Sequence, residues 1–231
     1  MLLNEIAALC GLTDRLPLPL LAGEQIERHD APAEPMWSDL LHGEIDVVCM
    51  PRPDTPRPET LFPGAFNPLH AGHEKIAQIA TDITGAATAM EISIINADKP
   101  PLDYAEMAER AQQVTSRYDL WFTRAATFVE KARLFPGVTF VVGSDTIERI
   151  ADPRYYDDDS ANRDKAIGSI RDLGCRFLVF GRKDGTRFIS LGDIDLPATL
   201  LEVCQEVGEA RFRMDISSTE LRKHGVESVQ S

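Results

Sequence analysis

The stretch that decides the fold is Gly64-Ala65-Phe66-Asn67-Pro68-Leu69-His70-Ala71-Gly72-His73, which lies between a short strand pattern and a helical pattern. Gly64 allows the backbone to approach a ligand closely, and Pro68 restricts the turn. His70 and His73 are three residues apart at the expected helix start, so their rings can point into one pocket. The N–H groups of a helix start add partial positive charge there. The stretch therefore predicts a phosphate-binding site that lacks the lysine of a P-loop.

Strand and helix patterns alternate along the chain from residue 60 onward. The expected strands are Thr60–Pro63, Met90–Asn96, Leu120–Thr123, Val138–Val142, Arg176–Phe180 and Arg211–Asp215. The expected helices are His73–Thr84, Tyr104–Arg117, Ala126–Leu134, Asp145–Ile150 and Ser218–His224. Repeated strand–helix units predict an α/β fold, a parallel sheet with helices on both faces. Such sheets bind ligands at the carboxyl ends of their strands, where the histidine motif falls.

The first 59 residues have a different character. Leu2–Leu12 could form a helix, Trp37–His42 a helical turn and Ile45–Met50 a strand. Four prolines between positions 51 and 58 indicate a stiff, extended linker. We therefore expect residues 1–59 to form an N-terminal arm and linker, and residues 60–231 the main domain. The sequence leaves open whether the arm packs on that domain or stands apart.

The composition limits the classes of partner. The 231 residues include 24 Lys and Arg against 37 Asp and Glu, a net charge of −13. This excess argues against binding to nucleic acid or to an anionic membrane, although a local pocket can still bind a small anion. Four cysteines form no CxxC pair, and neither a secretory leader nor a long apolar run is evident. These features predict a cytoplasmic protein with reduced thiols. Its oligomeric state stays open, with a homo-oligomer among the alternatives.

A second motif, Ile216-Ser217-Ser218-Thr219-Glu220-Leu221-Arg222, also lies between a strand pattern and a helical pattern. Ser217 or Ser218 can cap the helix. Their hydroxyls and the first N–H groups could surround a phosphate chain, with Arg222 adding a charge-assisted contact. Taken alone, the motif is better explained by an ordinary helix cap.

The two motifs together resemble those of the nucleotidylyltransferase superfamily, whose usual forms are GxFxPxHxGH and ISSTxxR. The resemblance extends over residues 61–224 and implies a Rossmann-like sheet. It is greatest to nicotinamide and nicotinate mononucleotide adenylyltransferases, in which a GxD similar to Gly143-Ser144-Asp145 contacts the nucleotide. Asn67 stands where many members have Asp, and the proline that usually follows an arginine equivalent to Arg182 is missing.

The positions of individual residues, together with the resemblance, suggest their roles. The catalytic candidates are His70, His73, Lys99 and Arg222. The nucleotide-binding candidates are Gly64, Ala65, Phe66, Asn67, Gly72, Gly143, Asp145, Arg182, Ile216, Ser217, Ser218 and Thr219. Trp121 and Arg124 are candidates for binding the acceptor. Structural explanations stand beside three of these roles: Asp145 could cap a helix, Lys99 could lie on an exposed turn, and Trp121 could belong to the core.

The implied reaction transfers a nucleoside monophosphate, AMP from ATP by expectation, to a small phosphorylated acceptor and releases pyrophosphate. Magnesium would arrive with the nucleotide and needs no dedicated protein site. Asp157, Asp158 and Asp159 lack the ligand spacing of a calcium loop and are expected to form a solvated acidic loop. Two alternatives stay open. One is a cytidylyltransferase acting on a phospho-alcohol, and the other is a nucleotide-binding regulatory protein with little transferase activity.

Overall fold

A computed structural model describes residues 2–25, 33–95, 100–184 and 187–211 of the chain. The helices are α1 (Leu2–Leu9), α2 (Pro35–His42), α3 (Ala71–Thr84), α4 (Tyr104–Val114), α5 (Phe128–Leu134), α6 (Ser144–Ala151), α7 (Ser160–Asp172) and α8 (Ala198–Leu201). The strands are β1 (Val47–Met50), β2 (Thr60–Pro63), β3 (Thr88–Ser93), β4 (Leu120–Thr123), β5 (Thr139–Gly143), β6 (Arg176–Phe180), β7 (Arg182–Asp184), β8 (Arg187–Ile189) and β9 (Cys204–Val207).

Seven strands form one sheet in the order β1-β4-β3-β2-β5-β6-β9. All neighbouring pairs are parallel except β1 with β4, where Val47 lies opposite Thr123 and Met50 opposite Leu120. From β2 the chain first proceeds to β3 and β4 on one side, and later to β5 and β6 on the other. The boundary between β2 and β5 is therefore the switch point of the sheet, where ligands of open α/β sheets bind.

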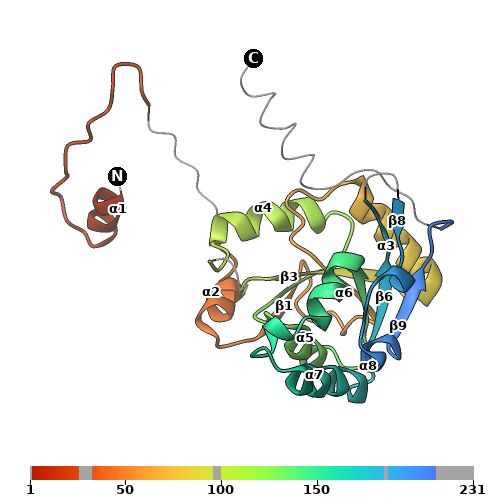
Figure 1. Cartoon of the computed structure of the whole chain (residues 1–231). Helices are drawn as coiled ribbons and strands as arrows, with labels where there is room; N and C mark the ends of the chain where they lie inside the picture. Colours follow the sequence, from red (N-terminus) through yellow and green to blue (C-terminus); the bar gives the residue numbers. More distant parts are fainter. Residues whose placement is uncertain (1, 26–32, 96–99, 185–186, 212–231) are drawn as a thin grey trace. The chain divides into compact units, whose positions relative to one another are not determined.

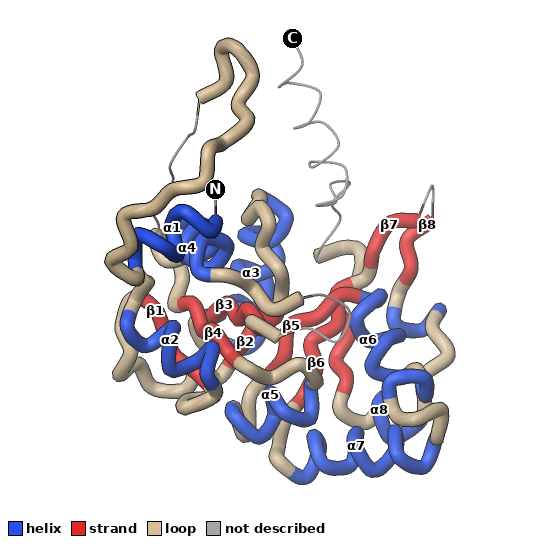
Figure 2. Tube along the Cα trace, turned by 90° about the vertical axis from the view of Figure 1, so that its left-hand side faces the viewer, coloured by secondary structure: helices blue, strands red, loops and turns tan. Residues whose placement is uncertain are grey.

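Two layers of helices cover the sheet, and each encloses an apolar core. One core joins α2, α3 and α4 to side chains such as Phe62, Met90 and Phe122, and the other joins α5, α6, α7 and α8 to the opposite face. Figure 1 shows α3 and α4 on one side of the strands and α5 and α7 on the other, and Figure 2 shows the strands between helices. Because strand side chains alternate between faces, nearly continuous apolar strands fill both cores. The expected α/β, Rossmann-like architecture is confirmed.

The segment before residue 60 contributes to this sheet. Trp37 and Leu40 of α2 are buried in the first core, and β1 pairs with β4 along its whole length. Contacts divide the chain into two compact units, residues 1–31 and 32–231, so this boundary lies earlier than the one expected at residue 59. The earlier unit contains α1. The difference arises because the strand at 47–50 buries apolar side chains and hydrogen bonds against the main sheet.

Several elements were not expected from the sequence: α7, the β7–β8 hairpin, α8 and β9. Asp159 accepts a hydrogen bond from the Ala161 N–H at 2.7 Å and thus caps α7, while Asp157 and Asp158 occupy left-handed backbone positions before it. The strand expected at 211–215 and the helix at 218–224 fall almost wholly outside the described residues. No helix among the described residues combines the length and the apolar character needed to cross a bilayer.

Candidate active site at the carboxyl edge of the sheet

Two of the predicted motifs leave adjacent strands at the switch point. The loop with both histidines follows β2 and begins α3, whereas Gly143-Ser144-Asp145 follows β5 and begins α6. Strands β2 and β5 are hydrogen-bonded neighbours, with Leu61 opposite Phe140. The topology therefore brings residues about eighty positions apart to the same edge of the sheet.

His70 and His73 form a stacked pair at the start of α3. Their ring centroids are 3.7 Å apart and their planes are inclined by 25°. The Gly72 N–H donates to Nδ1 of His70 at 3.1 Å, and the His70 N–H donates to Nδ1 of His73 at 3.4 Å. Both rings therefore accept hydrogen bonds from N–H groups at the start of α3, the groups that we expected to bind phosphate.

These contacts determine the protonation of both rings. A backbone N–H can donate only to an unprotonated ring nitrogen, so each neutral imidazole carries its proton on Nε2. Burial lowers the pKa of His70. Burial, together with the neighbouring His70, lowers the pKa of His73 from 6.5 to about 4. At neutral pH the site thus holds two uncharged imidazoles whose Nε2–H groups are hydrogen-bond donors.

Gly64 and Phe66, which precede the two histidines, give the loop its shape. Phe66 is 1% exposed and has a φ of 42°, a left-handed conformation that is rare for a bulky residue. Its ring lies edge-on to Phe62 and to His73, at centroid distances of 5.3 and 5.0 Å. A Cβ on Gly64 would lie 2.7 Å from the Phe66 ring, so only glycine fits there. Strain of this kind concentrates at functional sites, and here it seats the ring that supports His73.

The β5 loop supplies a second set of polar groups. Ser144 is 1% exposed, and its hydroxyl has no hydrogen-bond partner within the described residues. Asp145 Oδ1 forms an ion pair at 2.6 Å with Nε of Arg182, which stands at the start of β7. Gly143 ends β5 and is exposed, and it takes the N-cap position of α6. The structure therefore joins two predicted nucleotide contacts, Asp145 and Arg182, in one exposed pair.

The two acceptor candidates lie elsewhere. Trp121 is 1% exposed and packs in the second core, edge-on to Phe135 and beneath the Arg57 guanidinium. It also borders a pocket of about 590 Å³, which is lined by the proline-rich segment 51–58 and by residues at the amino ends of β3 and β4. Arg124 donates to the carbonyls of Leu40 and Leu41, both at 2.9 Å, and so holds the last turn of α2. The structure does not bring either side chain to the histidine pair.

The remaining candidates divide between the histidine loop and segments outside the described residues. Lys99, the run Ile216–Thr219 and Arg222 lie outside the described residues. Ala65 and Asn67 lie exposed in the histidine loop, and Gly72 is buried in the first turn of α3. Within the described ranges no three His, Cys, Asp or Glu side chains gather as metal ligands would.

A buried charged pair at this edge was not expected from the sequence: Glu91 of β3 with Lys131 of α5. Their side chains are 1% and 7% exposed, and Lys131 Nζ lies 2.6 Å from Glu91 Oε1. The available signal was a carboxylate between the apolar residues Met90 and Ile92 of a buried strand, because such a residue is buried only when it is paired.

The chain also matches a known protein family. The family model described as cytidylyltransferase-like matches residues 61–224, well over half of the chain, and this range includes both motifs. A search among curated proteins found no match.

Proposed function

Because the chain belongs to the cytidylyltransferase-like family of nucleotidyltransferases, we propose that it transfers AMP from ATP to a phosphorylated acceptor such as nicotinamide or nicotinate mononucleotide. The observation that carries the proposal is the neutral, stacked pair of His70 and His73 at the switch point. Two Nε2–H donors held by backbone contacts suit a group whose negative charge grows during the reaction.

The reaction needs no covalent intermediate. An oxygen of the acceptor phosphate attacks the α-phosphorus of ATP in line, and the bond from that phosphorus to the bridging oxygen breaks. The electron pair of the broken bond passes to the departing pyrophosphate. His70 and His73 would stabilise this charge by hydrogen bonds that strengthen in the transition state. Neutral donors need no proton transfer, so catalysis would rest on positioning and electrostatics, as in other phosphoryl transfers.

The remaining polar groups extend this cradle. Arg182 is partly exposed beside Asp145, so its guanidinium could turn toward a phosphate, and Asp145, at the start of α6, is proposed to contact the nucleotide. Lys99, Arg222 and the segment Ile216–Thr219 are proposed to complete it, on the resemblance of their motifs. Magnesium is proposed to arrive with the nucleotide, bound by the triphosphate oxygens and water.

The description of the matched family favours one second candidate, a cytidylyltransferase that joins CTP to a phospho-alcohol. Both candidates use the same histidine pair and differ only in the base and the acceptor.

A pyrophosphate-release screen separates these candidates. Four nucleoside triphosphates are combined with a panel of acceptors that includes both mononucleotides and two phospho-alcohols. The proposal expects release with ATP and a mononucleotide only, and its loss in a His70→Ala, His73→Ala double variant. Release with CTP and a phospho-alcohol would establish the second candidate. Binding of ATP without release on any acceptor would instead indicate a nucleotide-binding regulatory protein.

A further inference from the structure

Glu91 lies one strand away from the histidine loop. It is in register with Pro63, the last residue of β2, and its backbone carbonyl accepts the Gly64 N–H at 2.9 Å. Its side chain points to the α5 face of the sheet, because the flanking Met90 and Ile92 belong to the opposite core. The carboxylate is therefore placed near the carboxyl edge, on the side of the switch point occupied by β3 and β4.

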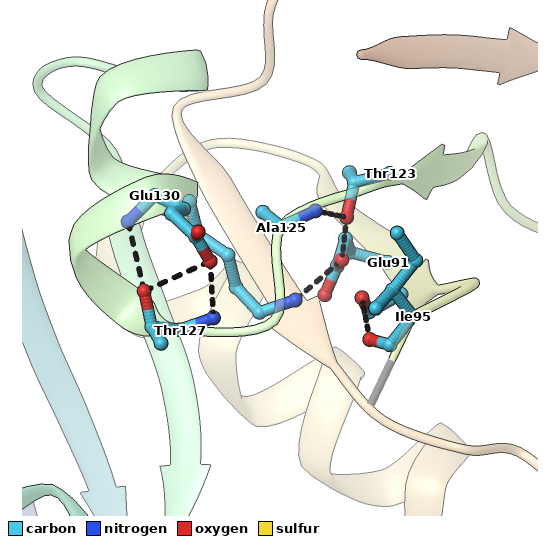
Figure 3. A network of polar contacts seen from close by, with 8 residues as sticks. Glu91, Ile95, Thr123, Ala125, Thr127 and Glu130 are labelled. Atoms are coloured by element: carbon cyan, nitrogen blue, oxygen red, sulfur yellow. Dashed lines mark hydrogen bonds and ion pairs between the residues drawn. The ribbon is translucent and has the colours of Figure 1, made fainter. Parts of the chain in front are cut away.

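Two donors hold this carboxylate by a single oxygen. Oε1 accepts from Lys131 Nζ at 2.6 Å and from the Thr123 hydroxyl at 2.5 Å. Figure 3 shows the donors converging from β4 and α5, with the Thr123 hydroxyl in turn accepting the Ala125 N–H at 3.3 Å. The α5 helix that carries Lys131 is itself capped by Thr127 and Glu130. The orientation of the carboxylate is thus determined from two separate elements.

The other oxygen, Oε2, is buried without a hydrogen-bond partner among the described residues. A buried carboxylate oxygen that lacks a donor is costly, and such groups usually have a functional explanation. The ion pair alone does not supply one, because an apolar pair of similar volume often serves the fold as well. An oriented acceptor at a ligand-binding edge instead calls for a donor from outside the protein.

We propose that Glu91 is a specificity-determining residue for the acceptor substrate. Its Oε2 accepts a hydrogen bond from an uncharged amide N–H of the acceptor and disfavours an acceptor that places a negative charge there. This inference rests on the proposed function.

The two mononucleotides make a sharp test, because they differ only in an amide against a carboxylate. A site that offers a hydrogen-bond acceptor favours the amide, and a buried negative charge repels the carboxylate. Wild-type enzyme is therefore expected to use nicotinamide mononucleotide at least tenfold more efficiently, measured as kcat/KM by pyrophosphate release.

The informative variant is Glu91→Gln. Because Lys131 and Thr123 both donate to Oε1, the amide oxygen of glutamine takes that place and its NH2 group takes the place of Oε2. The site then offers a donor where it offered an acceptor. The preference should shrink by tenfold or more. The KM for nicotinamide mononucleotide should rise, the KM for nicotinate mononucleotide should fall, and the KM for ATP should stay unchanged.

Thr123→Val is the matched control. It removes one hydrogen bond to Oε1 and leaves Oε2 and both charges in place, so the preference should persist despite some loss of stability. Competition calorimetry with the two mononucleotides on wild-type protein tests the preference without any variant. Equal use of both mononucleotides by wild type, or a preference that Glu91→Gln leaves unchanged, overturns the role of Glu91 and spares the proposed function. Transfer to neither mononucleotide overturns both.

Discussion

Acidification should destabilise this protein through His73. The unfolded chain takes up a proton on this histidine near pH 6.5, whereas the folded chain does so only near pH 4, because burial and His70 disfavour the charged ring. Between these values the unfolded state binds more protons, so the free energy of unfolding falls as the pH falls. Stability linked to His73 is fully present above about pH 6.5 and is lost on the way down to pH 4.

The size of the effect follows from the width of this window. Each pH unit in which only the unfolded state is protonated lowers the free energy of unfolding by about 1.36 kcal/mol. Lowering the pH from 7 to 5 should therefore lower it by about 2 kcal/mol. His70, whose pKa is also lowered by burial, adds to the loss in the same direction.

The measurement is urea unfolding of wild type and His73→Asn at pH 7 and pH 5. An asparagine oxygen can replace Nδ1 as the acceptor of the His70 N–H, so the variant keeps the contact and loses the titration. Other groups titrate in both proteins and cancel in the difference. If wild type and variant lose the same stability between the two pH values, His73 is not held neutral and the argument for uncharged donors is wrong.

Three further predictions concern catalysis and the fold. His70→Ala and His73→Ala should each lower kcat roughly a hundredfold, the scale of one lost oxyanion donor, with ATP affinity by calorimetry little changed; full turnover in both would contradict the proposed mechanism. Lys131→Met should lower the free energy of unfolding by about 3–5 kcal/mol because it leaves Glu91 buried and unpaired, and adding Glu91→Leu should restore most of it in urea melts. Gly181→Ala should lower the free energy of unfolding by about 1–3 kcal/mol, since the added Cβ would lie 2.4 Å from the Phe188 ring. Gly168→Ala in α7 should raise the free energy of unfolding, because open space surrounds that position. Equal Tm shifts for the two variants would refute the steric account.

The central strands and the histidine loop were predictable because local patterns determine them. The bounds of β2, β4 and β6 are those expected, since each is a short, apolar run between turn residues. In contrast, α7 buries only Ile167 and Ile170 and carries many charges, so its helical pattern is weak. The edge strand β9 is similarly obscured by its exposed polar residues.

The roles of single side chains were harder to predict, because they depend on distant partners. Arg124 follows a strand at the ligand edge, yet the last carbonyls of α2, more than eighty residues earlier, bind its guanidinium. Trp121 faces the second core because its neighbours in β4, Leu120 and Phe122, face the first core on the other side of the sheet. The tethering of both histidine Nδ1 atoms requires the folded start of α3 and cannot be deduced from their spacing alone.

The strand β1 also has a consequence for aggregation. It is four residues long, is followed at once by Pro51, and forms one border of the sheet, as the short β9 does at the other. Short borders and a nearby proline discourage strands of other molecules from adding to a sheet. A fragment that began at residue 60 would lose this border and present the buried, apolar β4 as a bare edge. The shortest fragment suited to expression in isolation therefore begins before α2, near residue 33.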